Sequence, residues 1–224
     1  MEKNKNLFEN YELIADIFTY PGEELRKKIK RVQNLLNDSY PEAAEIFIPF
    51  TNFSETIEIC KWEEIYTRSF DVQALTTLDL GYVLFGDDYK RGELLVNLSK
   101  EHKEANNPCH NELADHLPNV LRLLGKLTDE DLFADLIKII IYPALVKIAG
   151  EFEMKHIEKK TKIYKKHHRT IIEQDKSFFL IYISPIKALI KMIEKDFTEK
   201  ILNVNSGKDF SQKISSELEI EKLG

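Results

Sequence analysis

The stretch that decides the fold is residues 112–124, which read ELADHLPNVLRLL. Its apolar side chains recur three and four positions apart, which is the spacing of one face of an α-helix; they are Leu113, Leu117, Val120, Leu121 and Leu124. Pro118 is compatible with a helix only in the first turn, where its missing N–H costs nothing. We therefore expect a helix that starts near Asp115, with the Asp115 carboxylate as its cap.

The same helical spacing extends in both directions along the chain. It is found within residues 7–18, 25–36, 57–66, 78–85, 91–98, 132–144 and 186–197. We expect side-chain caps at Ser54, at Asp87 or Asp88, and at Thr128. Pro143 lies inside one of these stretches and should kink a central, buried helix. Residues 178–183 form an apolar run that fits either a strand or a buried helix.

Composition favours one helical domain. Of 224 residues, 43% are hydrophobic and 31% are charged, and only 8 are glycine and 7 proline. We expect a single all-α, bundle-like domain over residues 1–198, which includes an atypical basic segment at 155–176, and a polar, poorly ordered tail at 199–224. Cys60 and Cys109 form neither a disulfide framework nor a CxxC pair. The chain shows no signal peptide and no membrane span, so we expect a cytoplasmic protein without stable membrane insertion.

Charge is unevenly distributed along the chain. Residues 1–154 carry 28 acidic against 17 basic side chains, a net charge of −11, whereas residues 155–169 carry +6. An acidic body argues against general nucleic-acid binding and favours a basic polypeptide partner. The basic stripe at 155–169 fits a solvated helix or linker, or a surface for anionic lipid or nucleic acid.

The residues around Asp115 allow more than one interpretation. Cys109, His110, Asp115 and His116 include metal-ligand types but lack the paired spacing of a zinc site, which favours a loop followed by a helix cap. In the simplest interpretation Asp115 caps the helix and His116 is exposed on its first turn. In the functional interpretation the pair belongs to a partner-binding hinge. A helical metal-dependent enzyme that uses Asp115, His116 and nearby carboxylates such as Asp87 and Asp88 remains the alternative.

Three segments together resemble the redox enzyme maturation chaperones of the NarJ/TorD type, in the nitrate reductase assembly (delta-subunit) branch. They are residues 62–71, WEEIYTRSFD; residues 85–95, FGDDYKRGELL; and residues 112–124, which hold the Asp-His-Leu-Pro element. Weaker similarity extends through residues 11–21 and 139–148. The family usually has a proline before the Asp-His pair, where this chain has Ala114. The basic segment and the tail beyond about residue 155 are atypical of the family, so no functional residue is carried over there.

The resemblance implies an all-α fold without catalytic activity and without a cofactor of its own. It implies binding to the N-terminal segment of a molybdopterin oxidoreductase catalytic subunit during molybdenum cofactor insertion, in contact with cofactor-insertion proteins. The partner-binding residues that match the family motifs are Asp115, His116, Leu117, Pro118, Tyr66, Phe70, Asp71 and Arg91. Arg91 also fits a structural ion pair, and Gly92 fits close helix packing. Both a monomer and a homodimer are compatible with the sequence.

Overall fold

The computed structural model describes residues 2–127, 129–152 and 178–202, and this part of the chain is a single helical domain. The N-terminal half consists of α1 (Glu2–Ala15), the short 3-10 turn η1 (Asp16–Phe18), α2 (Glu23–Ser39), α3 (Pro41–Thr56) and α4 (Ile59–Phe70). The remainder consists of α5 (Leu80–Phe85), α6 (Tyr89–Glu104), α7 (Leu117–Leu124), α8 (Glu130–Asp135), the π-helical turn η2 (Leu136–Ile141), α9 (Tyr142–Glu151), the 3-10 turn η3 (Phe178–Tyr182) and α11 (Ile183–Leu202).

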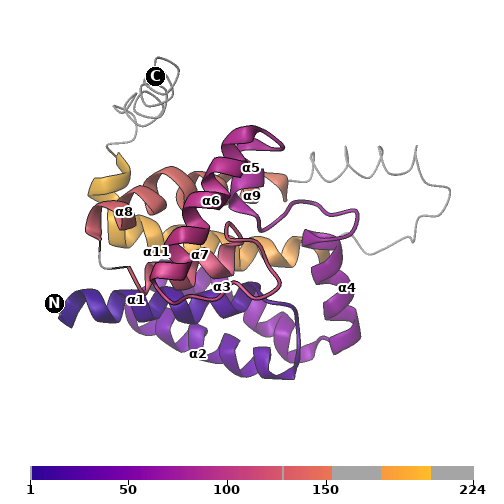
Figure 1. The fold of residues 1–224 in the computed structure, drawn as a ribbon. Coiled ribbons are helices and arrows are strands. Elements are labelled where there is room, and N and C mark those ends of the chain that lie inside the picture. The colour runs from indigo at the N-terminus through magenta and orange to yellow at the C-terminus, as the bar shows by residue number, and fades with distance from the viewer. Residues whose placement is uncertain (1, 128, 153–177, 203–224) are drawn as a thin grey trace, which may run out of the picture.

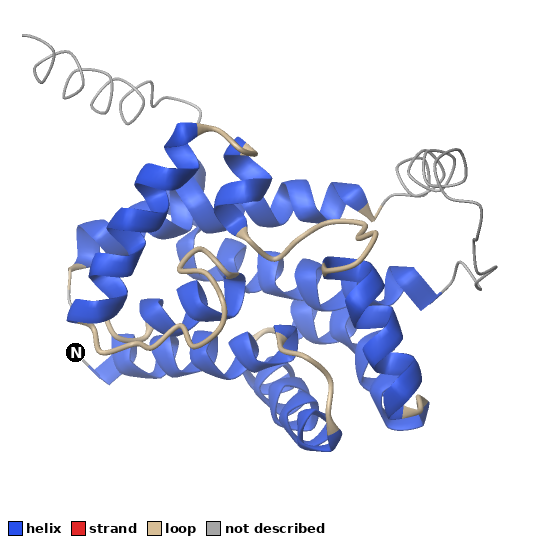
Figure 2. Ribbon diagram, turned by 45° about the vertical axis from the view of Figure 1, so that its right-hand side comes forward, coloured by secondary structure: helices blue, strands red, loops and turns tan. Residues whose placement is uncertain are grey.

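The helices pack in layers around α7 and α11 (Figure 1). Helices α1, α2 and α3 lie along one side, and α7 packs on α1 while α11 packs on α3. Helices α5, α6, α8 and α9 lie on the other side, where α9 contacts both α5 and α11. The ribbon in Figure 2 contains helices and loops only among the described residues. The all-α prediction is confirmed for this part of the chain.

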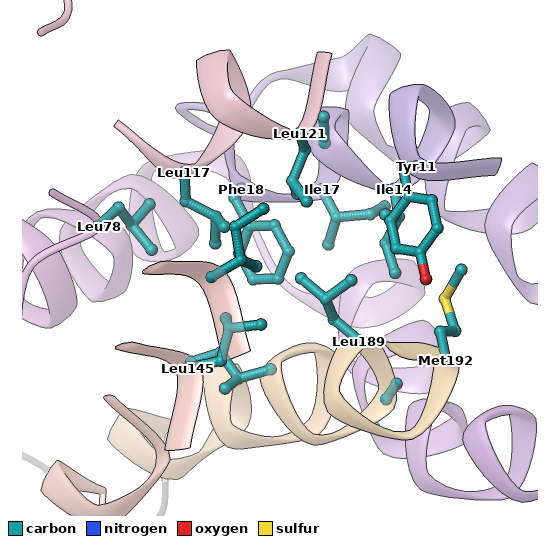
Figure 3. Close-up of a cluster of buried hydrophobic side chains, with 14 of the residues drawn as sticks. Tyr11, Ile14, Ile17, Phe18, Leu78, Leu117, Leu121, Leu145, Leu189 and Met192 are labelled. Atoms are coloured by element: carbon teal, nitrogen blue, oxygen red, sulfur yellow. The ribbon is translucent and has the colours of Figure 1, made fainter. Parts of the chain in front are cut away.

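The core forms where the predicted apolar faces meet (Figure 3). Ile14 of α1 and Phe18 of η1 face Leu121 of α7 and Leu189 of α11, and all four side chains are buried. Burying a side chain of this size contributes about 1.5–3 kcal/mol relative to leaving it exposed. The helical spacing read from the sequence therefore predicts which residues form the core.

The helix ends follow local chemistry at several predicted places. Helix α5 ends at Gly86, whose φ of 64° is a conformation that glycine adopts readily. The Asp88 carboxylate caps α6 by accepting a hydrogen bond from the Lys90 amide. The cap of α8 is Asp129 rather than Thr128, which lies outside the described residues. The prediction at Asp88 is thus confirmed.

The structure tests the kink expected at Pro143 and the cap expected at Ser54. Pro143 lies in the first turn of α9, and the π-helical turn η2 directly precedes this helix. The change from π-helix to α-helix at this point accommodates the proline. Ser54 was expected to start a helix, which is wrong. It lies inside α3, where its hydroxyl donates to the Thr51 carbonyl oxygen at 2.7 Å, and Pro49 does not shorten this helix.

The C-terminal segment, residues 178–202, resolves one open alternative. Residues 178–182 form the 3-10 turn η3 and not a strand. Helix α11 continues to Leu202, past the boundary expected at 198. The basic segment at 155–176 and residues 203–224 of the predicted tail lie outside the described residues.

Candidate functional site

Two short segments far apart in sequence pair directly and build the site. The Leu80 amide donates to the Asp115 carbonyl oxygen at 2.9 Å, and the Leu117 amide donates to the Leu78 carbonyl oxygen at 2.9 Å. Leu78 and Leu117 both point into the core beside Phe18 (Figure 3). These anchors place Asp79 opposite His116, so that the two side chains meet.

Four charged or titratable side chains form a connected group, which we call the Arg91 cluster: Asp79, Arg91, Asp115 and His116. The Arg91 guanidinium donates to Asp115 Oδ2 at 3.1 Å and to Asp79 Oδ2 at 3.0 Å. His116 Nδ1 lies 3.1 Å from Asp79 Oδ1, so Asp79 links the cation to the imidazole. The structural ion pair predicted for Arg91 is confirmed, and the cluster ties α6 to the segments that precede α5 and α7.

Asp115 is the deepest member of the cluster. Its side chain is 0% exposed, and its Oδ1 atom has no hydrogen-bond partner among the described residues. Burial raises the pKa of Asp115 above its ordinary value, and the neighbouring Asp79 carboxylate adds to the shift, although the hydrogen bond from Arg91 opposes it. The pKa of Asp79 is lowered instead, because the hydrogen bonds and charges of His116 and Arg91 outweigh its burial.

The simplest interpretation of the Asp-His pair is wrong for both residues. The N-terminal boundary residue of α7 is His116, and no side chain caps this helix. Asp115 is instead held by Arg91, and the His116 side chain is only 13% exposed. Pro118 does lie in the first turn, as predicted.

A glycine makes room for the buried carboxylate. A Cβ atom added to Gly81 would lie 2.7 Å from Asp115 Oδ2, closer than Cβ atoms approach other atoms in proteins, and 3.2 Å from Arg91 Cγ, which is a tight contact. The close packing expected at Gly92 is wrong, because an added Cβ there would have nothing within 4 Å. The family-like Arg-Gly element therefore contributes its arginine, whereas the glycine required by packing is Gly81.

Buried amide side chains fix the loop between α6 and α7. Asn119 Nδ2 donates to the Cys109 and Leu113 carbonyl oxygens at 3.3 Å and 3.0 Å. Asn107 Nδ2 lies 2.8 Å from His102 Nδ1, and His102 Nε2 lies 2.9 Å from the Ala114 carbonyl oxygen. Because a carbonyl oxygen only accepts, His102 carries its proton on Nε2 and accepts at Nδ1. Burial lowers the pKa of His102, which keeps this arrangement neutral.

The loops and helices enclose an open pocket of about 1470 Å³. Six of the eight predicted partner-binding residues line it, namely Tyr66, Phe70, Asp71, Arg91, His116 and Pro118. Asp115 and Leu117 do not, because both are fully buried beneath it. The loop from α4 to α5 and the loop from α6 to α7, drawn in tan in Figure 2, supply much of the remaining lining. The three segments that resemble the chaperone family thus converge on one surface feature.

Aromatic side chains form one wall of the pocket. The Tyr66 hydroxyl donates to the Phe18 carbonyl oxygen at 3.0 Å, and the Tyr66 ring contacts Tyr20 and Phe70 with centroid separations of 5.5 Å and 5.3 Å. The pKa of Tyr66 is raised, first by burial and then by the nearby carboxylates of Glu112, Asp71 and Asp79. Trp62, by contrast, is fully buried in the core, and Tyr82 is 43% exposed with its ring 5.2 Å from the Arg91 guanidinium carbon.

The donor arrangement required by the metal-dependent alternative is not assembled. Among the described residues, no three histidine, cysteine, aspartate or glutamate side chains are placed so that they could hold one metal ion. Asp87 and Asp88 are exposed, and Asp88 is engaged as the α6 cap. Asp115 is directed at Arg91, whose cation already occupies the position beside its carboxylate.

Sequence reasoning missed Asp79, Gly81, Asn107 and Asn119. None of them lies in a local pattern that marks a site, since their partners come from distant segments. The isolated acid in the Leu-Asp-Leu-Gly run at 78–81 interrupts an apolar stretch. An acid within an apolar stretch is drawn partly out of water with its neighbours and then needs a partner, which is the signal that the sequence offers for Asp79.

A scan against models of known protein families finds no match to this chain, and a search of curated proteins finds none either. Within the described residues, no helix is both long and apolar enough to cross a membrane.

Proposed function

We propose that this chain is a non-catalytic cytoplasmic chaperone. Its client is the catalytic subunit of a molybdopterin oxidoreductase of nitrate reductase type. It binds the N-terminal segment of that subunit and keeps it competent for insertion of the molybdenum cofactor, in cooperation with cofactor-insertion proteins. The observation that carries the proposal is the convergence of the three family-like segments on one pocket.

The size and lining of the pocket suit a peptide segment. Its volume of about 1470 Å³ exceeds the range of about 300–1,000 Å³ that is usual for small-molecule sites. Tyr20 and Tyr82 line it and are 58% and 43% exposed, and aromatic side chains are enriched at protein interfaces. An amphipathic client segment would place its apolar side on these rings, as in helix-in-groove recognition.

The Arg91 cluster has a supporting role in this proposal. Asp115 is fully buried, so it acts by fixing Arg91, whose guanidinium lies beneath the exposed Tyr82 ring. Asp79 orients His116 on the pocket surface. The Asp-His pair thus shapes the binding surface through Arg91 and Asp79, and His116 is the member of the pair that reaches a client.

Calorimetric titration tests the proposal. The ligand is a peptide of about the first 30 residues of the molybdoenzyme large subunit encoded beside this chain, long enough for helix-in-groove binding. We expect wild-type binding with micromolar or tighter affinity. Tyr82→Ala should weaken it at least about fivefold, the effect of losing one aromatic contact.

The matched control is Tyr89→Ala, because Tyr89 is 67% exposed but does not line the pocket. Its affinity should equal that of the wild type. Absence of binding to both the peptide and the whole cofactor-free subunit would refute the proposal. Equal losses in the two tyrosine variants would place the site elsewhere.

A further inference from the structure

Two side chains of the Arg91 cluster present polar atoms to the pocket. Arg91 and His116 both line it, and their side chains are only 16% and 13% exposed, so their positions are largely fixed by the surroundings. Asp79 holds both of them, because its carboxylate accepts from Arg91 at 3.0 Å and lies 3.1 Å from His116 Nδ1. A single carboxylate therefore brings a guanidinium and an imidazole together at the pocket surface.

Each of these two side chains has a nitrogen that the cluster does not engage. Arg91 uses Nε toward Asp115 and Nη2 toward Asp79, and His116 uses Nδ1. Among the described residues, Arg91 Nη1 and His116 Nε2 have no hydrogen-bond partner, and the only buried side-chain atom without one is Asp115 Oδ1. Nη1 and Nε2 are therefore accessible to a ligand in the pocket.

Asp79 also determines which nitrogen of His116 carries the ring proton. The pKa of Asp79 is lowered despite its burial by the hydrogen bonds and charges of His116 and Arg91, so the group is a carboxylate that only accepts. Glu112 Oε2 lies 3.9 Å from the same ring nitrogen, Nδ1. With carboxylates on that side, the neutral imidazole carries its proton on Nδ1, and Nε2 is an acceptor.

The two nitrogens thus offer one donor and one acceptor to a ligand. Arg91 Nη1 can only donate, and His116 Nε2 accepts. A cationic group offers no acceptor to Arg91, and a carboxylate offers no proton to His116. A primary carboxamide suits both, because its oxygen accepts, its nitrogen donates, and the two atoms are bonded to one carbon.

We propose that Arg91 Nη1 and His116 Nε2 form a subsite for the carboxamide of an asparagine or glutamine side chain in the bound client segment. The carboxamide oxygen accepts from Arg91, and its N–H donates to His116. Asp79 is a positioning residue, since it holds both side chains and places the ring proton. The inference rests on the proposed function for the identity of the client, whereas small amides test the chemistry of the subsite without it.

The first experiment titrates small probes into the full chain carrying isotope-labelled histidine. Propionamide, propionate and butanone are compared at about pH 8, where histidine is ordinarily neutral, and the ring nitrogens of His116 are followed by NMR. Butanone has the shape of propionamide and its carbonyl oxygen but no N–H. We expect an unprotonated Nε2 that shifts saturably with propionamide, and about fivefold weaker binding of propionate and butanone, the effect of losing one neutral hydrogen bond. A proton on Nε2 would overturn the inference.

Histidine variants locate the binding. His116→Asn keeps an N–H near the position of Nδ1 and removes Nε2, and asparagine is favoured at this first position of a helix, so the fold is kept. Propionamide binding should fall about fivefold. The matched control is His110→Asn, because His110 also lines the pocket, is exposed, and has a φ of 53° that asparagine tolerates; its affinity should equal that of the wild type. Unchanged binding in His116→Asn, or equal affinity for propionamide and butanone, would refute the subsite.

Asp79→Asn tests the polarity of the two nitrogens. Arg91 can only donate, so the oxygen of the new amide must face Arg91 and its NH2 must face His116. His116 Nδ1 then accepts, the ring proton moves to Nε2, and the pocket meets two donors. We expect this variant to bind propionate more tightly than propionamide, the reverse of the wild type. The same preference in both proteins would contradict the assignment of one donor and one acceptor.

The client peptide separates this inference from the proposed function. If the peptide binds but neither replacement of its asparagine and glutamine residues nor His116→Asn weakens it, the subsite is refuted while the chaperone function stands. If propionamide binds with the expected selectivity and the peptide does not bind, the subsite stands and the proposed client is wrong. If both bind, the His116→Asn effect should disappear in the peptide that lacks the bound carboxamide, because the two changes remove the same contact.

Discussion

Replacing Arg91 with methionine should destabilise the protein by about 3 kcal/mol at neutral pH, because the buried Asp115 carboxylate loses its partner. The guanidinium makes charged hydrogen bonds of 3.1 Å to Asp115 and 3.0 Å to Asp79, and Asp115 is 0% exposed. Removing one member of a buried ion pair costs about 3–5 kcal/mol. We take the lower end because Asp115 can bind a proton and because Asp79, 24% exposed, regains water.

Urea denaturation measures this effect with a built-in probe. Trp62 is the only tryptophan, it is fully buried, and its indole N–H donates to the Tyr182 hydroxyl oxygen at 2.9 Å, so its fluorescence reports the loss of the core. A destabilisation of about 3 kcal/mol corresponds to a midpoint lowered by about 1 M. The matched control is Arg31→Met on the exposed side of α2, which should change stability by less than about 0.5 kcal/mol.

The pH dependence tests the reasoning more strictly. The pKa of Asp115 in the fold lies above its ordinary value, and removing Arg91 should raise it further. A group with a raised folded pKa is most favourable below its ordinary pKa, and that contribution is lost as pH rises through the folded pKa. The gap between Arg91→Met and wild type should therefore be smaller at pH 5 than at pH 7.5, and Asp115→Asn in the same background should recover stability. A loss below about 1 kcal/mol, or a gap that does not change with pH, would refute the account.

Three further predictions, which use four variants, test the surroundings of the cluster. Gly81→Ala should destabilise the protein by about 1–3 kcal/mol through overpacking against Asp115. Gly92→Ala should stabilise it by about 0.5–1 kcal/mol, because position 92 is exposed on α6 and alanine favours a helix. Changes of melting temperature in the same direction for both variants would contradict this. Asn119→Ala should remove the side-chain donor that binds two carbonyl oxygens of the α6–α7 loop and leave each of them with one backbone donor. Hydrogen exchange in residues 108–114 should therefore accelerate while α2 stays protected. Burial lowers the pKa of His102, so its contribution to stability is present above its ordinary pKa and is lost as pH falls through the folded value. His102→Gln should therefore make the free energy of unfolding depend less on pH below about pH 6.5. An unchanged pH dependence would argue against a neutral His102 in the fold.

The helices themselves were largely predictable because their causes are local. The faces at 25–36 and 117–124 are buried as their spacing predicts, and Gly86 and Asp88 mark the helix ends. Periodicity depends on neighbouring side chains, so one sequence is sufficient to read it. The prediction failed at Ser54, which lies inside α3 although it is a good capping residue. At residues 178–183 periodicity left a strand and a buried helix open, and the structure shows the 3-10 turn η3 over residues 178–182.

The candidate site was predicted only in part. The family-like motifs marked six residues that line the pocket, but they gave no reason for these residues to lie together. Asp115 was expected to act on its own helix, and its actual partner is Arg91, which is 24 positions away. A helix cap and a buried ion pair both require a carboxylate that accepts hydrogen bonds. Sequence patterns do not show whether the donor is a backbone amide of the same helix or a distant arginine.

The sequence by itself determined that this chain folds into helices and which face of each helix is buried, because both follow from side chains three and four positions apart. Only the tertiary structure decided that Asp79 completes the Arg91 cluster, that Gly81 leaves room for Asp115, and that Tyr20 and Tyr66 meet edge to face in the wall of a pocket. Those arrangements depend on how the helices pack, and a packed interior sets distances between residues that no local spacing encodes.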